Sequence, residues 1–204
     1  MSMIRLPEPE KSVMARRSVI AADLARLLGA DRVISDDDGR RAFETDALTA
    51  YRRMPLCVVL PQTTDEVAAA LAYCHKHKIK VIARGAGTSL AGGALPSEDG
   101  VVIAVSRMNR VLEVDTESRI ARVETGITNL GITAAVSPKG FFYAPDPSSQ
   151  LACTLAGNIG MNSGGAHCLK YGVTTNNILG VKMVMMDGEI VEIGGAHADA
   201  AGYD

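Results

Sequence analysis

The sequence predicts an α+β fold with two lobes, preceded by an N-terminal helical arm. Aliphatic, β-branched runs flank a helical pattern between residues 57 and 105, and alternating strands with a hairpin signal follow residue 111. Hydrophobic residues make up 47% of the 204 residues and aromatic residues only 4%, so we expect an aliphatic core. We place the arm at 1–54, the first lobe at 55–110 and the second lobe at 111–204.

The composition argues against several functional classes. A formal charge of −2 gives no electrostatic basis for binding nucleic acid. No apolar run approaches the ~20 residues of a membrane span, and the polar start of the chain lacks the apolar centre of a signal peptide. The four cysteines stand far apart, which argues against an iron–sulfur or zinc site and fits a reducing compartment. We therefore expect a cytoplasmic protein without a metal site.

The N-terminal arm is expected to be loose over 1–17 and helical afterwards. From Ser18 to Leu28 the apolar residues share one face, and Gly29 supplies the stop. A run of three aspartates at 36–38 could bind a cation, but a solvated turn is the better interpretation.

The first lobe is expected to hold a small sheet with a helix packed on it. Thr63 and Glu66 have the spacing of a capping box, which begins a helix running to about His77. His75 and His77 are two residues apart and do not face one another on a helix, so we interpret them as solvated and not as metal ligands. The predicted strands, rich in β-branched residues, are 57–60, 80–83 and 101–105.

The chain is organised around a glycine-rich loop that directly follows the strand at 80–83. Gly85 and Gly87 permit positive φ and remove the Cβ atoms that would block a close ligand. Backbone N–H groups of such a turn form an anion-binding concavity, with two hydroxyls and a rim charge added by Thr88, Ser89 and Arg84. Leu90 stands where the dinucleotide fingerprint needs its third glycine, and the lysine of a Walker loop is missing. The loop predicts diphosphate binding of another type, with a tight surface turn as the alternative.

The second lobe is expected to combine a mixed or antiparallel sheet with short helices. Gly126 ends one strand, and a short helix follows until Pro138 breaks it. Asp187 and Gly188 give a tight hairpin signal between the last two strands. The predicted strands are 111–114, 119–125, 178–186 and 189–193.

A second small-residue segment lies between 154 and 165. Pro145 and Pro147 stiffen an extended lead-in around Asp146. As a plain helix the segment would be poor, because each interior glycine costs roughly 0.5–1 kcal/mol. A segment that accepts this cost gains a ligand contact or close packing, and we favour the ligand. Its small residues are Ala156, Gly157, Gly160, Gly164 and Gly165.

Three motifs in this order resemble the FAD-linked oxidases of the vanillyl-alcohol-oxidase/PCMH type. Arg84 to Ser89, followed by Ala91-Gly92-Gly93, looks like their pyrophosphate loop. Pro145-Asp146-Pro147 before the Gly157-to-Gly165 run looks like their second flavin segment. The run from His167 to Gly172 is most similar to the FAD-binding subunits of glycolate oxidase, which are related to D-lactate dehydrogenases.

The resemblance implies a PCMH-type FAD-binding domain of two α/β lobes whose C-terminal part is missing here. It implies an FAD-dependent 2-hydroxy-acid oxidoreductase that passes hydride from glycolate to flavin N5 and forms glyoxylate. D-lactate or D-2-hydroxyglutarate dehydrogenase, and a non-catalytic flavin-binding fragment, stay open as alternatives. Catalytic residues are expected beyond Asp204, so we name none, and this fragment alone is expected to be inactive.

The resemblance also implies a non-covalent cofactor and further subunits. Some relatives tether flavin through a histidine in the first loop, and Thr88 fills that place here. An iron–sulfur subunit is the expected electron-accepting partner, with at most peripheral association at the inner membrane face. His167 is interpreted as a packing residue, because no partner acid or base is identifiable in the sequence. The cofactor-binding candidates are Arg84, Gly85, Ala86, Gly87, Thr88, Ser89, Gly92, Gly93, Gly126, Pro145, Asp146, Ser148, Thr154, Gly157, Asn158, Asn162, Ser163, Gly164, Gly165 and Gly172.

Overall fold

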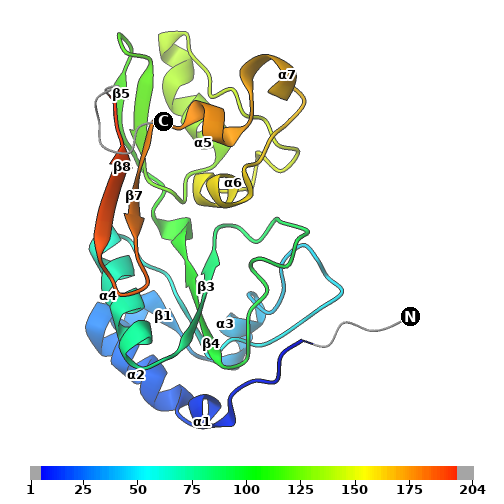
Figure 1. Ribbon diagram of the computed structural model, residues 1–204, viewed down its shortest axis with the longest axis vertical. Helices are drawn as coiled ribbons and strands as arrows, with labels where there is room; N and C mark the ends of the chain where they lie inside the picture. The colour runs from blue at the N-terminus through cyan, green and yellow to red at the C-terminus, as the bar shows by residue number, and fades with distance from the viewer. Residues whose placement is uncertain (1–5, 197–204) are drawn as a thin grey trace.

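The computed structural model describes residues 6–196 and confirms the α+β class (Figure 1). The first part of the chain forms α1 (Lys11–Met14), α2 (Arg17–Leu28), η1 (Ala30–Arg32), β1 (Val33–Ile34), α3 (Asp37–Arg41), β2 (Cys57–Val59), α4 (Thr64–Lys76), β3 (Lys80–Arg84), β4 (Gly100–Ala104) and η2 (Val105–Arg107). The remainder forms β5 (Val111–Asp115), β6 (Ile120–Val123), α5 (Asn129–Val136), η3 (Ser137–Lys139), α6 (Leu155–Met161), α7 (Cys168–Tyr171), η4 (Thr174–Asn177), β7 (Gly180–Val184) and β8 (Ile190–Gly194).

The first lobe is built on a four-stranded sheet in the order β1-β2-β4-β3. β4 runs parallel to both of its neighbours, and β1 pairs antiparallel with β2. Both faces of the sheet are covered, since Val59 and Val101 pack into the core formed with α2 and α4, while Val58 and Val102 pack on the opposite side. Burial on both faces explains why these strands read as continuous aliphatic runs. The expected small sheet with a packed helix is confirmed.

The N-terminal segment belongs to this core, which differs from the loose arm expected over 1–17. Lys11–Met14 forms a helical turn, and Val13 is only 4% exposed in the same cluster as Ile20 and Leu24. Burial of these three aliphatic side chains holds the segment against the sheet. The boundaries at residues 54 and 110 remain predictions.

The aspartate run begins a helix instead of forming a simple turn. Asp36 accepts a hydrogen bond from the Gly39 N–H at 2.8 Å and so caps α3. Among residues 6–196, no group of three or more acidic, histidine or cysteine side chains is arranged to hold a metal ion.

The second lobe contains two separate antiparallel ribbons in the described residues, where one sheet was expected. β5 pairs with β6, and β7 pairs with β8 around the turn at Asp187-Gly188. The β7–β8 ribbon runs beside α4 of the first lobe (Figure 1), and a Cβ on Gly188 would lie 2.8 Å from the Ala68 carbonyl oxygen. This contact ties the last ribbon to the first lobe. Within residues 6–196, every helix is too short or too polar to cross a lipid bilayer.

Part of the small-residue segment, Leu155–Met161, forms the helix α6 in spite of the conformational cost expected of its interior glycines. Thr154 caps α6 by accepting from the Gly157 N–H at 3.2 Å, and Asn162 ends it in the left-handed region at φ 47°. Burial of Leu155 and Asn158 helps to offset the conformational entropy of the glycines.

Candidate functional site

The two small-residue segments line one crevice between the lobes. Its volume is about 1000 Å³, and its walls come from the loop after β3, from α6 and from the inner faces of β6, β7 and β8. The predicted residues that line it are Arg84, Gly85, Ala86, Gly87, Thr88, Ser89, Gly93, Thr154, Gly157, Asn158 and Ser163.

The first wall is the loop Gly85–Gly93, which we call the phosphate loop. Gly87 adopts φ +72°, which a residue with a Cβ rarely tolerates. Within residues 6–196, the backbone N–H groups from Ala86 to Ser89 donate no hydrogen bond. A turn at a strand end with several free N–H groups and two hydroxyls, on Thr88 and Ser89, is suited to an anion.

The second wall, α6, touches the phosphate loop directly. A Cβ on Gly85 would overlap the hydroxyl oxygen of Thr154 and lie 3.4 Å from the Gly157 nitrogen. The absence of a side chain at Gly85 therefore permits the two walls to meet.

Arg84 lies under the phosphate loop and not at its exposed rim as expected. The residue is 9% exposed, and its Nη1 donates to the Thr45 carbonyl at 2.7 Å. Its Cζ lies 5.4 Å from the centre of the Phe43 ring. The carbonyl and the ring give the guanidinium partners inside the protein, which explains its inward direction.

Asn158 supports the second wall from within. Its side chain is 2% exposed and donates to Asn129, whose own Nδ2 donates to the Pro145 carbonyl at 2.8 Å. This buried network joins α5, α6 and the Pro145 lead-in. Asn129 was not among the predicted residues, because an isolated asparagine at the start of a short helix carries no sequence signal of its partners.

Asp146 and His167 form a pair outside the crevice lining. The Asp146 carboxylate lies 2.6 Å from His167 Nδ1 and accepts the His167 backbone N–H at 3.2 Å. The hydrogen bond from that backbone N–H, with the imidazole adding to it, lowers the pKa of Asp146. His167 thus has a partner acid, which could not be identified from the sequence. The two residues join the lead-in to the turn after α6.

The remaining predicted residues are outside the crevice lining. Several are tightly packed against protein atoms: a Cβ on Gly126 would meet the Met108 carbonyl at 2.8 Å, and one on Gly172 would meet the Asn176 side chain at 2.5 Å. Asn162 accepts hydrogen bonds from the Thr175 backbone and hydroxyl. The residues outside the lining are Gly92, Gly126, Pro145, Asp146, Ser148, Asn162, Gly164, Gly165 and Gly172.

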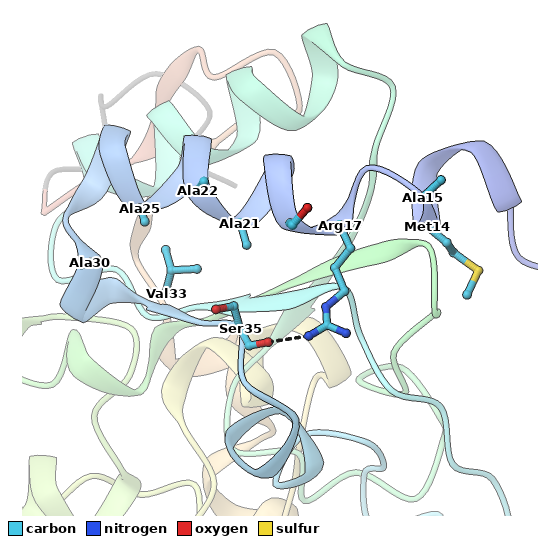
Figure 2. Close-up of a pocket in the computed structure, with 10 residues that line it drawn as sticks. Met14, Ala15, Arg17, Ala21, Ala22, Ala25, Ala30, Val33 and Ser35 are labelled. Atoms are coloured by element: carbon cyan, nitrogen blue, oxygen red, sulfur yellow. Dashed lines mark hydrogen bonds between the residues drawn. The ribbon is translucent and has the colours of Figure 1, made fainter.

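A second hollow of about 610 Å³ lies beside α2 in the first lobe (Figure 2). Small side chains of α2, including Ala21, Ala22 and Ala25, form much of its lining. Its one charged lining residue, Arg17, donates to the Ser35 carbonyl at 2.8 Å. None of the predicted site residues borders it, so the crevice between the lobes is the candidate site.

Comparison with known proteins identifies the class. Residues 55–194 match the FAD binding domain family, and the chain belongs to that family. It is 44% identical to the glycolate oxidase subunit GlcD of Escherichia coli (strain K12) over 93% of this chain. It is 37% identical to a D-lactate dehydrogenase of Archaeoglobus fulgidus over 80% of this chain.

The fold is shared with a solved structure of p-cresol methylhydroxylase. The TM-score is 0.74 at 19% identity, over 91% of this chain and 36% of that chain. Both sequence relatives are much longer: the chain spans 38% of the E. coli protein and 37% of the A. fulgidus protein. The PCMH-type fold expected from the sequence is confirmed.

Proposed function

We propose that this chain forms the FAD-binding part of a flavin-dependent 2-hydroxy-acid oxidoreductase. The observation that carries the proposal is that the two small-residue walls line one crevice in a chain of the FAD binding domain family. Glycolate, oxidised to glyoxylate, is the favoured substrate because the glycolate oxidase subunit is 44% identical. The similarity to a D-lactate dehydrogenase supports D-lactate as the second candidate.

The crevice fits FAD in shape and chemistry. Free N–H groups between Ala86 and Ser89, with the Thr88 hydroxyl, suit the diphosphate. Gly157 and Gly160 of α6 present backbone without side chains to a flat ligand. Aliphatic side chains line much of the remainder and suit the ring systems of the cofactor.

In this proposal the chain positions the cofactor and other parts of the whole protein complete the reaction. Bound FAD supplies the acceptor for the hydride of a 2-hydroxy acid. The residues of this chain bind the diphosphate, hold the two walls together and keep water from one side of the ligand. Position 88 holds a threonine where some relatives have the histidine that links flavin covalently, so the cofactor is held non-covalently.

The whole protein is proposed to work with further oxidase subunits. One of them, carrying an iron–sulfur cluster, would take the electrons. We place the assembly in the cytoplasm, with at most peripheral contact with the inner membrane face. The name "subunit" of the E. coli relative supports an assembly of several chains.

FAD titration of the purified protein tests the proposal. We expect quenching of flavin fluorescence, a yellow protein, and release of the flavin by denaturant. Thr88→Ala should weaken binding, because it removes a hydroxyl that lines the crevice, whereas Thr116→Ala, in the exposed turn between β5 and β6, should not. Absence of quenching with the unaltered protein would contradict FAD binding by this chain. An activity screen of the full-length protein with glycolate, D-lactate and D-2-hydroxyglutarate distinguishes the substrates.

A further inference from the structure

The guanidinium of Arg84 is directed at the underside of the phosphate loop. Nη1 donates to the Thr45 carbonyl at 2.7 Å and to the Ala94 carbonyl at 3.4 Å, so it bonds to a distant segment and to the residue that follows the loop. A Cβ on Gly87 would lie only 2.5 Å from the Arg84 Cζ. The guanidinium therefore fills the space that a side chain on Gly87 would need.

A segment far away in the sequence completes this arrangement. Phe43 and Thr45–Ala47, which we call the N-terminal brace, contact the loop from outside. The Ala47 N–H donates to the Gly87 carbonyl at 2.9 Å, and the Phe43 ring stacks with Arg84. The brace is itself fixed, because Thr45 Oγ1 donates to the Tyr51 carbonyl at 2.9 Å.

We propose that Arg84 and the N-terminal brace hold the phosphate loop in its ligand-ready shape, so that Arg84 is a positioning residue and not a ligand of the diphosphate. The proposal rests on the proposed FAD function. The loop has few internal hydrogen bonds of its own in the described residues, since its N–H groups from Ala86 to Ser89 are free. Bonds to the brace and to Arg84 therefore take the place of the backbone hydrogen bonds that would otherwise hold this segment.

The charge of Arg84 also helps to keep its side chain beneath the loop. Burial lowers the pKa of the guanidinium, and the negative charge of Asp46 opposes this, so that the side chain stays a cation. Asp46 is 4% exposed and is itself held by the Leu48 N–H at 3.0 Å. Asp46 carries the opposite charge, so this carboxylate helps the hydrogen bonds of Arg84 to hold the buried cation beneath the loop.

Two measurements separate positioning from direct ligation. Amide hydrogen exchange of the FAD-free protein reports the bond from Ala47 to Gly87, and FAD titration reports affinity. Arg84→Ala should raise the exchange rate at Ala47 and raise the Kd for FAD on the order of 10–100-fold. Arg84→Lys should recover part of both, and Phe43→Leu, which keeps an apolar side chain in the core, should raise the Kd about 3-fold.

Arg40→Ala is the matched control. Arg40 is also a buried arginine of the first lobe, 5% exposed, and donates to the Pro55 carbonyl, but it does not line the crevice. We expect its loss to lower thermal stability while the Kd for FAD and the exchange at Ala47 stay unchanged.

The outcomes are distinct. A raised Kd in Arg84→Ala with unchanged exchange at Ala47 would overturn positioning and make Arg84 a diphosphate ligand. An unchanged Kd and unchanged exchange in Arg84→Lys and Phe43→Leu would overturn the proposal even if Arg84→Ala fails to fold. If the unaltered protein does not bind FAD, the proposed function fails, while hydrogen exchange still tests whether the brace holds the loop.

Discussion

Gly85→Ala tests whether the two walls of the crevice touch as described. The added Cβ would overlap the hydroxyl oxygen of Thr154, while the backbone at Gly85 lies outside the left-handed region. The effect is therefore steric and not a matter of backbone strain. Gly93→Ala is the control for stability, because no atom lies within 4 Å of the position that its Cβ would take.

The magnitude follows from what Thr154 must give up. Its hydroxyl caps α6 by accepting the Gly157 N–H at 3.2 Å, and loss of such a cap costs about 1 kcal/mol. Forcing a methyl group into a packed contact costs about 1–3 kcal/mol more. We expect Gly85→Ala to lower the free energy of unfolding by about 2–4 kcal/mol, or Tm by about 4–16 °C for a chain of this size. FAD affinity should fall as well, because the walls must separate.

Urea unfolding followed by circular dichroism measures the loss of stability. Thr154→Ala tests whether the contact with the Thr154 hydroxyl is its cause. Thr154→Ala alone should cost about 1 kcal/mol, and the double variant should cost less than the sum because the clashing oxygen is gone. Gly93→Ala should stay within about 0.5 kcal/mol of the unaltered protein. A Gly85→Ala protein as stable as Gly93→Ala, or strict additivity in the double variant, would refute the contact between the walls.

Three further predictions concern stability in acid, the α6 wall of the crevice and the reactivity of two buried thiols. Burial works against ionisation of Asp99, but hydrogen bonds from Lys80 and other donors outweigh it and lower its pKa to about 2. This shift contributes roughly 2 kcal/mol to the free energy of unfolding above about pH 4, and the contribution is lost between about pH 4 and 2. Urea titrations should therefore show that the difference in stability between the unaltered protein and Asp99→Asn closes over that range. Gly160→Ala should stabilise α6 by about 0.5–1 kcal/mol, because alanine favours helix and the site for its Cβ is open. The same variant should bind FAD more weakly in a fluorescence titration, because Gly160 lines the crevice. An unchanged affinity would place the ligand away from α6. Burial raises the pKa of Cys57 and Cys74 to about 12, so mass spectrometry after treatment of the native protein with a thiol reagent at pH 8 should find both unmodified, and rapid labelling of either would contradict their burial.

The sheet of the first lobe was predictable because its signal is local. Val58 and Val102 lie in short β-branched runs, and their complete burial on a parallel sheet is what such runs favour. The start of α4 was equally predictable, since Thr63 accepts the Glu66 N–H at 3.1 Å within one turn of helix.

Two of the misses depend on contacts between distant residues. Arg84 turns inward because Thr45, 39 positions earlier, offers a carbonyl. His167 has a partner acid because Asp146, 21 positions earlier, lies beside it in the fold. No periodicity or spacing encodes such pairs, so a single sequence gives the residues but not the direction in which their side chains point.

The glycines show how a sequence pattern can indicate a location without giving the reason for it. A glycine pattern indicates positions where a Cβ does not fit, and either a ligand or the protein itself can occupy the space. At Gly126 and Gly165 backbone atoms of the protein fill that space, whereas at Gly93 and Gly160 the space is open and belongs to the crevice. The open positions therefore leave room for a ligand in the crevice, and the filled ones allow the chain to pack closely against itself.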